Sequence, residues 1–551
     1  MALFKLPGPI KSLHLLLCTL YLFINWISLN SGIGVYTCLI LYNLAIIYEL
    51  IIEKSGGIDL QILGIGKNGH IGFNEPGSSF HSKTRVIHLD QLTRMANVYE
   101  WHDLNKVPQL AITVGISSIM KAKKIVLLAW SNKADIVAKA VEGSITEQIP
   151  ASILQNHDDC TFVIDELAAT ELTRHKSPWL TGANDWTPQM IKKAVIDLAL
   201  KLNKTVLSLT SDDYKENSLS DLLVLKASVY DINLQVFYML RDSITGWPGG
   251  KPNAVIPAHP ERSEPHSKKV LIFSPHPDDD IIRMDGTYMR LHDQGHDVHV
   301  AYQTSGNIAV TDEFVTRFLD FAVGFEDLFG IDNKKSQEIL SNARAFLANK
   351  ATNHLDTAEI RAIKGLIRRC EAKATCRYVG ISENNYHFMD LPFYETGMID
   401  KKPLSEKDIE ISMELLRKIQ PHQVYCAGDL ADPHGTHKVC LDVVFESMRR
   451  LKAAGDSWVK DCWVWLYKGA WQEWDISEIE MAVPMSPDQV MKKRFGIFIH
   501  QSQKDSVPFQ GTDSREFWQR AEIRNANTAN LYANLGLTKY AAMEAFVRWH
   551  Y

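Results

Sequence analysis

The residue types best suited to chemistry occur in two clusters, and each directly follows an apolar run typical of a strand. Ser274-Pro-His-Pro-Asp-Asp-Asp280 follows Val270–Phe273, and Asp432-Pro-His-Gly-Thr-His437 follows Gln423–Ala427. Because ligands gather at the carboxyl ends of strands in open α/β sheets, we expect one shared site. Two imidazole nitrogens and one carboxylate oxygen with an open position are a catalytic zinc arrangement. The alternative is an acidic turn that only caps a helix, but two such clusters after two strands favour the metal site.

The stretch from about residue 268 to 475 resembles the LmbE/PIG-L family of zinc-dependent N-deacetylases, which carry a His-Pro-Asp-Asp turn and a later His-x-x-His. The metal ligands that this resemblance implies are His276, Asp279 and His437. It also implies that Asp278 is the general base and that His434 stabilises the oxyanion or protonates the leaving amine. A bound Zn²⁺ lowers the pKa of its water to about 7, and a neighbouring carboxylate can then accept the proton.

A second motif, Leu63-Gly-Ile-Gly-Lys-Asn-Gly-His-Ile-Gly-Phe-Asn-Glu-Pro-Gly-Ser78, follows another predicted strand. Gly64, Gly66 and Gly69 match the dinucleotide fingerprint, so an NAD site is one interpretation. No apolar helix follows Gly69, however. His70 and the Asn-Glu-Pro turn place polar groups where a packed helix would begin, which disfavours NAD. Histidine is a side chain that can accept and donate protons near neutral pH.

This motif closely resembles the active-site loop of the glucosamine-6-phosphate deaminase family, and the resemblance covers about residues 48–172. It implies that His70 opens the sugar ring as acid and base, while Glu75 and Asn68 orient it. The substrate-binding residues that it implies are Gly66, Gly69 and Lys133. Upstream of residue 48 the sequence shows neither the family's phosphate loop nor the aspartate that abstracts the C2 proton. We therefore expect an impaired deaminase.

The order of apolar and periodic segments predicts an α/β protein. We expect two Rossmann-like three-layer α/β domains with a helical linker and a helical C-terminal tail, plus an apolar helical N-terminal segment. The Pro/Gly-rich stretch 246–265 is the clearest boundary. The expected segments are 1–47 (apolar), 48–175 (partial deaminase-like domain), 176–267 (helical connector and linker), 268–475 (deacetylase-like domain) and 476–551 (helical extension).

Periodicity places the individual elements within these segments. The predicted strands are 59–63, 111–114, 124–129, 161–164, 269–273, 298–303 and 423–427. The predicted helices are 134–141, 188–203, 216–243, 281–294, 404–419, 486–494 and 514–535.

The composition limits the class of protein. The chain has 551 residues and a formal net charge of -6. It therefore lacks the excess of positive charge that attracts nucleic acid, and we expect no nucleic-acid partner. Its eight cysteines show no CxxC pair, which fits a reducing cytosol and a cytoplasmic location. Residues 13–30 and 35–52 are nearly continuous apolar runs, so membrane attachment through residues 13–52 is the alternative location. Homo-oligomerisation is also left open.

These motifs predict an enzyme of amino-sugar metabolism that acts on a phosphorylated or N-acetylated amino sugar. One module would convert glucosamine 6-phosphate to fructose 6-phosphate and ammonia without a cofactor. The other would be a zinc-dependent hydrolase that removes an N-acetyl group. The alternative function is a non-catalytic sugar-phosphate sensor, or a membrane-tethered binding protein, on a degenerate deaminase fold.

Overall fold

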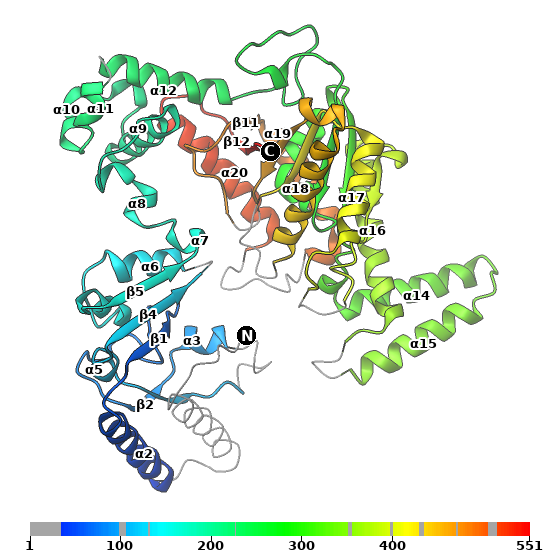
Figure 1. The fold of residues 1–551 in the computed structure, drawn as a ribbon. Helices are drawn as coiled ribbons and strands as arrows, with labels where there is room; N and C mark the ends of the chain where they lie inside the picture. The colour runs from blue at the N-terminus through cyan, green and yellow to red at the C-terminus, as the bar shows by residue number, and fades with distance from the viewer. Residues whose placement is uncertain are drawn as a thin grey trace. The chain divides into compact units, whose positions relative to one another are not determined.

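The computed structural model describes residues 35–97, 106–130, 133–225, 228–350, 355–396, 401–428, 435–469, 472–504 and 515–551. The chain divides into two compact units, unit 1 (Met1–Gly182) and unit 2 (Ala183–Tyr551), whose elements are labelled in Figure 1. The residues that follow Gly182 therefore belong to the same unit as the C-terminal chemical cluster.

Unit 1 contains a parallel three-stranded sheet of order β1-β4-β5 and a separate antiparallel pair, β2-β3. Its strands are β1 (Leu60–Gly64), β2 (Arg85–His88), β3 (Leu110–Thr113), β4 (Lys124–Ala129) and β5 (Cys160–Ile164). Its helices are α2 (Val35–Lys54), α3 (Gln91–Ala96), α5 (Ile116–Ile119), α6 (Ala134–Val141), α7 (Glu166–Ala169) and α8 (Thr173–Lys176). The three parallel strands lie within one residue of their predicted positions.

The core of unit 1 lies between β4 and α6. Burial alternates along β4, and its buried Ile125 and Leu127 belong to the same apolar cluster as Val137 of α6. Such alternation is what a strand with one buried face requires. β1 forms an edge of the sheet, and the Ile62 side chain on it is 57% exposed. The described residues therefore cover one face of β1 only in part.

Unit 2 is built on a seven-stranded sheet of order β11-β12-β10-β9-β6-β7-β8. Its strands are β6 (Lys269–Ser274), β7 (Asp297–Tyr302), β8 (Tyr386–Phe388), β9 (Gln423–Ala427), β10 (Trp463–Tyr467), β11 (Met481–Met485) and β12 (Ala542–Trp549). The five strands from β10 to β8 are parallel, and β12 runs antiparallel to both of its neighbours. The parallel part has the Rossmann-like arrangement that the sequence predicts.

Helices cover both faces of this sheet. They include α13 (Asp279–Asp293), α16 (Ala358–Val379), α17 (Glu406–Ile419), α18 (Thr436–Ala454), α19 (Pro487–Ile499) and α20 (Phe517–Asn534). Further helices of the unit are α9 (Pro188–Leu202), α10 (Ser211–Glu216), α11 (Ser220–Leu225), α12 (Val229–Ser243), α14 (Asp312–Leu328) and α15 (Lys334–Ala348). In Figure 1, α14 and α15 form a hairpin, and it shares a small apolar cluster with α16.

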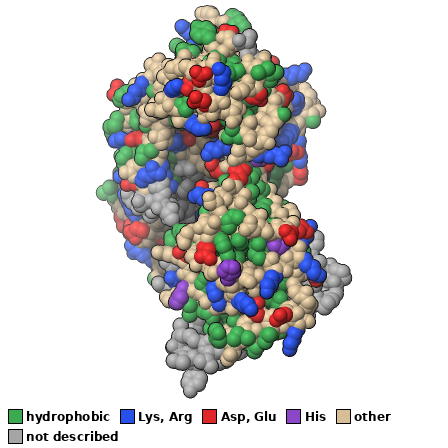
Figure 2. All heavy atoms as spheres, turned by 90° about the vertical axis from the view of Figure 1, so that its left-hand side faces the viewer, with side chains coloured by type: hydrophobic (Ala, Val, Ile, Leu, Met, Phe, Trp, Pro, Cys, Tyr) green, Lys and Arg blue, Asp and Glu red, His purple; other side chains and the backbone are tan. Residues whose placement is uncertain are grey.

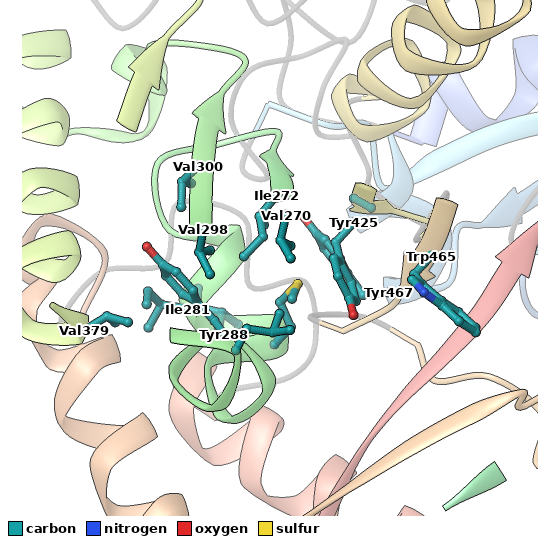
Figure 3. Close-up of a cluster of buried hydrophobic side chains, with 14 of the residues drawn as sticks. Val270, Ile272, Ile281, Tyr288, Val298, Val300, Val379, Tyr425, Trp465 and Tyr467 are labelled. Carbon is teal, nitrogen blue, oxygen red and sulfur yellow. The ribbon is translucent and has the colours of Figure 1, made fainter. Parts of the chain in front are cut away.

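The two faces of the central strand β6 bury different side chains. On one face, Val270 packs with Val298 of β7 and with Ile281 and Tyr288 of α13, as Figure 3 shows. On the other face, Leu271 belongs to the cluster that contains α18 side chains. A strand that is buried on both faces needs a continuous apolar run. This requirement explains why β6 was easy to recognise in the sequence.

Two predictions of secondary structure are wrong. The segment 476–551 contains the predicted helices, as α19 and α20, but it also supplies β11 and β12 to the sheet. The residues of β12 include Ala, Met and Glu, which favour helices, and pairing within the sheet overrides that propensity. The single helix predicted at 216–243 is instead two helices, α11 and α12, on either side of residues outside the described part.

Figure 2 shows acidic and basic side chains interspersed over the face that it draws. In the part of the chain that the structure describes, no helix is long and apolar enough to cross a membrane. α2 corresponds to the second predicted apolar run. Residues 13–34 of the predicted membrane segment lie outside the described residues.

Candidate functional site

Two loops at the carboxyl edge of the seven-stranded sheet bring the predicted metal ligands together. β6 ends at Ser274, and the turn after it carries His276 and leads into α13, which begins at Asp279. His437 lies in the first turn of α18, the helix that follows β9. Since β6 and β9 are adjacent and parallel, both loops leave the sheet at the same edge.

The three donor atoms form a nearly equilateral triangle, which we call the donor triangle. His276 Nδ1 lies 3.2 Å from Asp279 Oδ2 and 3.2 Å from His437 Nε2, and His437 Nε2 lies 3.4 Å from Asp279 Oδ2. A tetrahedral zinc ion with ligand bonds of about 2.0–2.1 Å separates its donors by about 3.3 Å, so the triangle fits such an ion. Among the described residues, this is the only group of three His, Cys, Asp or Glu side chains placed to hold a metal.

Arg283, one turn into α13, supplies a positive charge beside the donor triangle. Its Nε donates to Asp279 Oδ1 at 2.7 Å, and its Nη2 lies 3.3 Å from His437 Nδ1. Burial alone would raise the pKa of Asp279, but the charges of Arg283 and then His437 hold that pKa well below its ordinary value. Asp279 is therefore ionised. Sequence analysis did not single out Arg283; its i,i+4 spacing from Asp279 on a helix is the signal that could have indicated the pair.

Asp278, the predicted general base, is the N-cap residue of α13 and is buried. Arg368 of α16 donates from Nη2 to Asp278 Oδ1 at 2.8 Å, and it is buried as well. Local sequence gives no signal for this partner, because the two residues are 90 positions apart. His434, predicted to assist the leaving group, lies outside the described residues.

Asp280, the third carboxyl group of the turn, contacts strands rather than the donor triangle. Ser274 Oγ of β6 donates to one carboxyl oxygen at 3.1 Å, and Tyr302 OH of β7 donates to the other at 3.2 Å. Burial raises the pKa of Asp280 to about 7. This side chain therefore ties the metal-site turn to two adjacent strands.

In unit 1, the residues predicted to open the sugar ring meet in the loop after β1. His70 Nδ1 lies 2.8 Å from Asn68 Oδ1 and 3.4 Å from Glu75 Oε2, and Asn68 Nδ2 donates to that Glu75 oxygen at 2.7 Å. Thr93 of α3 adds a contact of 3.2 Å between its Oγ1 and His70 Nδ1. Burial alone would raise the pKa of Glu75, but hydrogen bonds from His70, Thr93 and Asn68 lower it. Sequence analysis did not indicate Thr93.

The glycines of this loop make room for its side chains. A Cβ on Gly66 would lie 2.2 Å from the His70 ring, so only glycine fits there without displacement. Gly69 has a φ of +85°, which favours glycine. Lys133, at the start of α6, donates from Nζ to the Ile65 carbonyl at 2.8 Å. The predicted substrate-binding residues thus lie on or beside the His70 loop.

The NAD interpretation is not supported by the backbone after this loop. A dinucleotide site needs a helix that begins directly at the glycines. Here the chain forms isolated bridges from Ile65 to Ile71 and from Ile71 to Asn74, and the next helix, α3, begins only at Gln91.

Two family models match this chain. Residues 42–163 match the model described as glucosamine-6-phosphate isomerases/6-phosphogluconolactonase, and residues 271–448 match GlcNAc-PI de-N-acetylase, named PIG-L. The first range contains the His70 loop, and the second contains the donor triangle. The predicted pair of modules is therefore confirmed at the level of family.

Relatives place the two modules in one chain. A glucosamine-6-phosphate deaminase-like protein of Bacteroides thetaiotaomicron is 50% identical over 505 residues, which are 91% of this chain and 76% of the relative. The glucosamine-6-phosphate deaminase of Oceanobacillus iheyensis is 50% identical over 129 residues, 23% of this chain and 52% of that enzyme. The chain thus spans about half the length of that enzyme.

Among solved structures, the N,N'-diacetylchitobiose deacetylase of Pyrococcus horikoshii is 20% identical with a TM-score of 0.33, over 51% of this chain and 84% of that chain. The Bacteroides match is far more extensive, since it covers most of both chains. On that ground this protein belongs to the family of glucosamine-6-phosphate deaminase-like proteins, with an isomerase-type domain followed by a PIG-L domain.

Proposed function

We propose that unit 2 is a zinc-dependent hydrolase that removes the acetyl group from an N-acetylated amino sugar. The observation that carries this proposal is the donor triangle of His276, Asp279 and His437, with edges of 3.2–3.4 Å. The buried Asp278 adjoins it in the same turn. The match to a de-N-acetylase family over residues 271–448 supports the reaction class.

Each side chain of the site would have a distinct role in the reaction. Zn²⁺ bound at the donor triangle would supply Lewis-acid activation of water and of the amide carbonyl. Asp278 would accept the proton of the attacking water, because Arg368 fixes its carboxyl group away from bulk solvent. His434 would stabilise the oxyanion or protonate the leaving amine. Asp280 would hold the turn that carries these groups in place.

Acetate release tests this proposal. The purified full-length chain is assayed with Zn²⁺ on N-acetylglucosamine, its 6-phosphate and N,N'-diacetylchitobiose. We expect release on at least one of these, loss after chelation and recovery when Zn²⁺ is returned. His276→Ala and His437→Ala should lose both zinc and activity. His292→Ala, on α13 but with 36% of its side chain exposed and paired to Asp293, is the matched control and should keep both. An unchanged rate in fully metal-free protein would contradict the proposal.

Unit 1 supports a second candidate function, the isomerising deamination of glucosamine 6-phosphate. The observation that favours it is the network of His70, Asn68 and Glu75 within 2.7–3.4 Å of one another. In this proposal His70 opens the sugar ring, and the other two side chains orient it. Lys133 and the glycines Gly66 and Gly69 would bind the substrate, which is a phosphorylated amino sugar.

Ammonia release from glucosamine 6-phosphate tests the second function. We expect a low rate that His70→Asn abolishes, because the replacement keeps a polar side chain but cannot carry protons near neutrality. His81→Asn, at an exposed position of the same unit, is the control and should keep the wild-type rate. If the wild type releases no ammonia but the sugar phosphate still raises its Tm, unit 1 binds without turnover, as the sensor alternative requires.

A further inference from the structure

We propose that the hairpin formed by α14 and α15 is the surface through which two copies of this chain associate. The proposal concerns a face of unit 2 that the metal site does not use, so it stands independently of the proposed function. Its basis is a row of exposed apolar side chains on α14, together with the area of that row and the charges of the hairpin.

α14 has two apolar faces instead of one. Its inner face buries Val315 and Leu319, which share an apolar cluster with Leu340 of α15 and Ile360 of α16. A surface helix of a soluble monomer needs only such an inner face. The spacing of three and four residues places a second set of apolar side chains on one outer side of the helix. This set, which we call the apolar stripe, consists of Phe318, Phe321, Phe325, Leu328 and Phe329.

The apolar stripe is a continuous patch rather than a scatter of exposed residues. Its members are between 38% and 78% exposed. The ring centroids of Phe321 and Phe325 are 6.3 Å apart, and those of Phe325 and Phe329 are 4.8 Å apart. Monomeric proteins rarely expose an apolar patch of more than a few hundred Å², and larger patches mark interaction sites. The stripe therefore indicates a binding surface.

An ion-pair network holds the base of the hairpin to α16. Asp312, the first residue of α14, lies 2.9 Å from Lys350 Nζ and 2.7 Å from Lys364 Nζ. Asp356 lies 2.7 Å and 2.8 Å from the same two nitrogens. Two carboxylates thus share two ammonium groups, and Lys364 of α16 is buried. Because the hairpin is fixed in this way, association would not first have to order it, which lowers the entropic cost of binding.

The area of the apolar stripe fits an interface with two-fold symmetry. With about 200 Å² for each fully exposed side chain of this size, the observed exposures correspond to about 600 Å² per copy. Pairing the stripes of two copies would bury about 1,200 Å² before any contact at the rim is added, which reaches the roughly 1,200–2,000 Å² of specific interfaces. In a two-fold arrangement the same surface serves both copies, and two helical hairpins can pack as a four-helix bundle.

The charges of the hairpin favour a second copy over a lipid surface as the occupant. α14 has five acidic side chains and one arginine, whereas α15 has three basic side chains and one glutamate. Two antiparallel hairpins can therefore bring α14 of one copy towards α15 of the other with opposite charges. A helix that lies in a membrane interface instead carries Lys and Arg on its polar face, and an anionic bilayer would repel the acidic α14.

Sedimentation equilibrium of the full-length chain, from nanomolar to near-millimolar concentration, tests the proposal. We expect a monomer–dimer equilibrium in the wild type. Phe321→Glu and Leu328→Glu each place a carboxylate in the apolar interface twice, once per copy, and each should raise the dimer Kd by about a hundredfold or more. Leu225→Glu is the matched control for Leu328→Glu. Leu225 is an exposed leucine on α11, which Figure 1 draws apart from the hairpin, and the Kd of this variant should equal that of the wild type.

Hydrogen exchange of the wild type below and above its Kd identifies the surface without any substitution, and it serves if the glutamate variants do not fold. Amides of α14 and α15 should gain protection as the dimer forms. A wild type that stays monomeric at near-millimolar concentration would overturn the proposal. So would a dimer whose Kd is unchanged in both glutamate variants, or one whose newly protected amides lie outside the hairpin.

A membrane role for the stripe would give a different result. The wild type would then be monomeric and would sediment with vesicles of phosphatidylcholine and phosphatidylserine, and Phe321→Glu would abolish that binding. This outcome would show that the occupant is a lipid surface and that the proposed dimer is wrong. Since no measurement here uses acetate or ammonia release, failure of the dimer and failure of the proposed function are read separately.

Discussion

Replacement of Glu544 by leucine should strongly destabilise unit 2, although Glu544 lies in the tail segment beyond the predicted deacetylase domain. Glu544 of β12 accepts from Lys493 Nζ of α19 at 2.6 Å, from the backbone N–H groups of Gly286 and Thr287 at 3.0 and 2.7 Å, and from Thr287 Oγ1 at 2.6 Å. Those N–H groups are available because α13 is non-helical at Met284. The carboxylate thus caps the second half of the metal-site helix.

The magnitude follows from these partners. Glu544 and Lys493 are each 1% exposed, so Glu544→Leu leaves a buried ammonium without its counter-ion, which costs about 3–5 kcal/mol. The unpaired N–H groups of α13 add about 1–3 kcal/mol. We therefore expect a loss of at least about 4 kcal/mol, a large share of the roughly 5–15 kcal/mol that stabilises a typical domain.

Urea unfolding followed by tryptophan fluorescence measures this loss, and the two units are analysed as separate transitions. The matched control is Glu522→Leu, which removes the 2.6 Å ion pair with Arg494 at a partly exposed position and should cost about 1 kcal/mol. Adding Lys493→Met to Glu544→Leu should recover about 1–3 kcal/mol relative to the sum of the single changes. The reasoning fails if Glu544→Leu costs no more than the control, or if the two changes are additive.

Three further predictions concern the sites and their surroundings. Gly66→Ala should destabilise unit 1 by about 1–3 kcal/mol, because the new Cβ would lie 2.2 Å from the His70 ring; an unchanged urea midpoint would contradict the packing argument. Arg368→Met should lower kcat/KM for acetate release by about a hundredfold at unchanged zinc content, because Asp278 loses its 2.8 Å partner; parallel loss of zinc would instead indicate a disrupted site. Burial lowers the pKa of His296 to about 4 in the folded protein, against about 6.5 in the unfolded chain. The contribution of neutral His296 to stability is therefore complete above about pH 6.5. It is lost as the pH falls toward 4, because the unfolded chain binds the proton at a higher pH than the folded protein does. Between pH 7 and pH 5 the wild type should lose about 2 kcal/mol more than His296→Asn, and equal losses would refute the assignment.

The sequence predicted those parts of the structure that depend on short-range patterns. The bounds of β4, α6 and β9 are the predicted ones, because β4 and β9 are short apolar runs and α6 repeats its buried apolar residues at helical spacing. The metal ligands were found for a similar reason. His276 and Asp279 follow one apolar strand and His437 follows another, and parallel strands bring their carboxyl ends together.

Partners that lie far apart in the chain could not be predicted in this way. Arg368 contacts Asp278 across 90 positions, and its helix, α16, was not among the predicted elements. Glu544 lies in a segment whose composition favours a helix, so its position in a strand and its contacts with α13 could not be predicted. Arg283 stands four residues after Asp279, but a charge pair on a helix is usually a surface feature, and only burial shows that this one adjoins the donor triangle.

The position of β12 also affects the order in which the protein can be completed during synthesis. β12 lies between β10 and β11, although its residues are translated after both. A growing chain that has reached residue 500 already carries the donor triangle and most of the sheet, yet both neighbours of β12 still expose unpaired backbone groups. Such open edges can pair with other nascent chains, so this interval favours aggregation. Slow translation of the last strand would prolong the hazard, and a chaperone that covers the gap would relieve it.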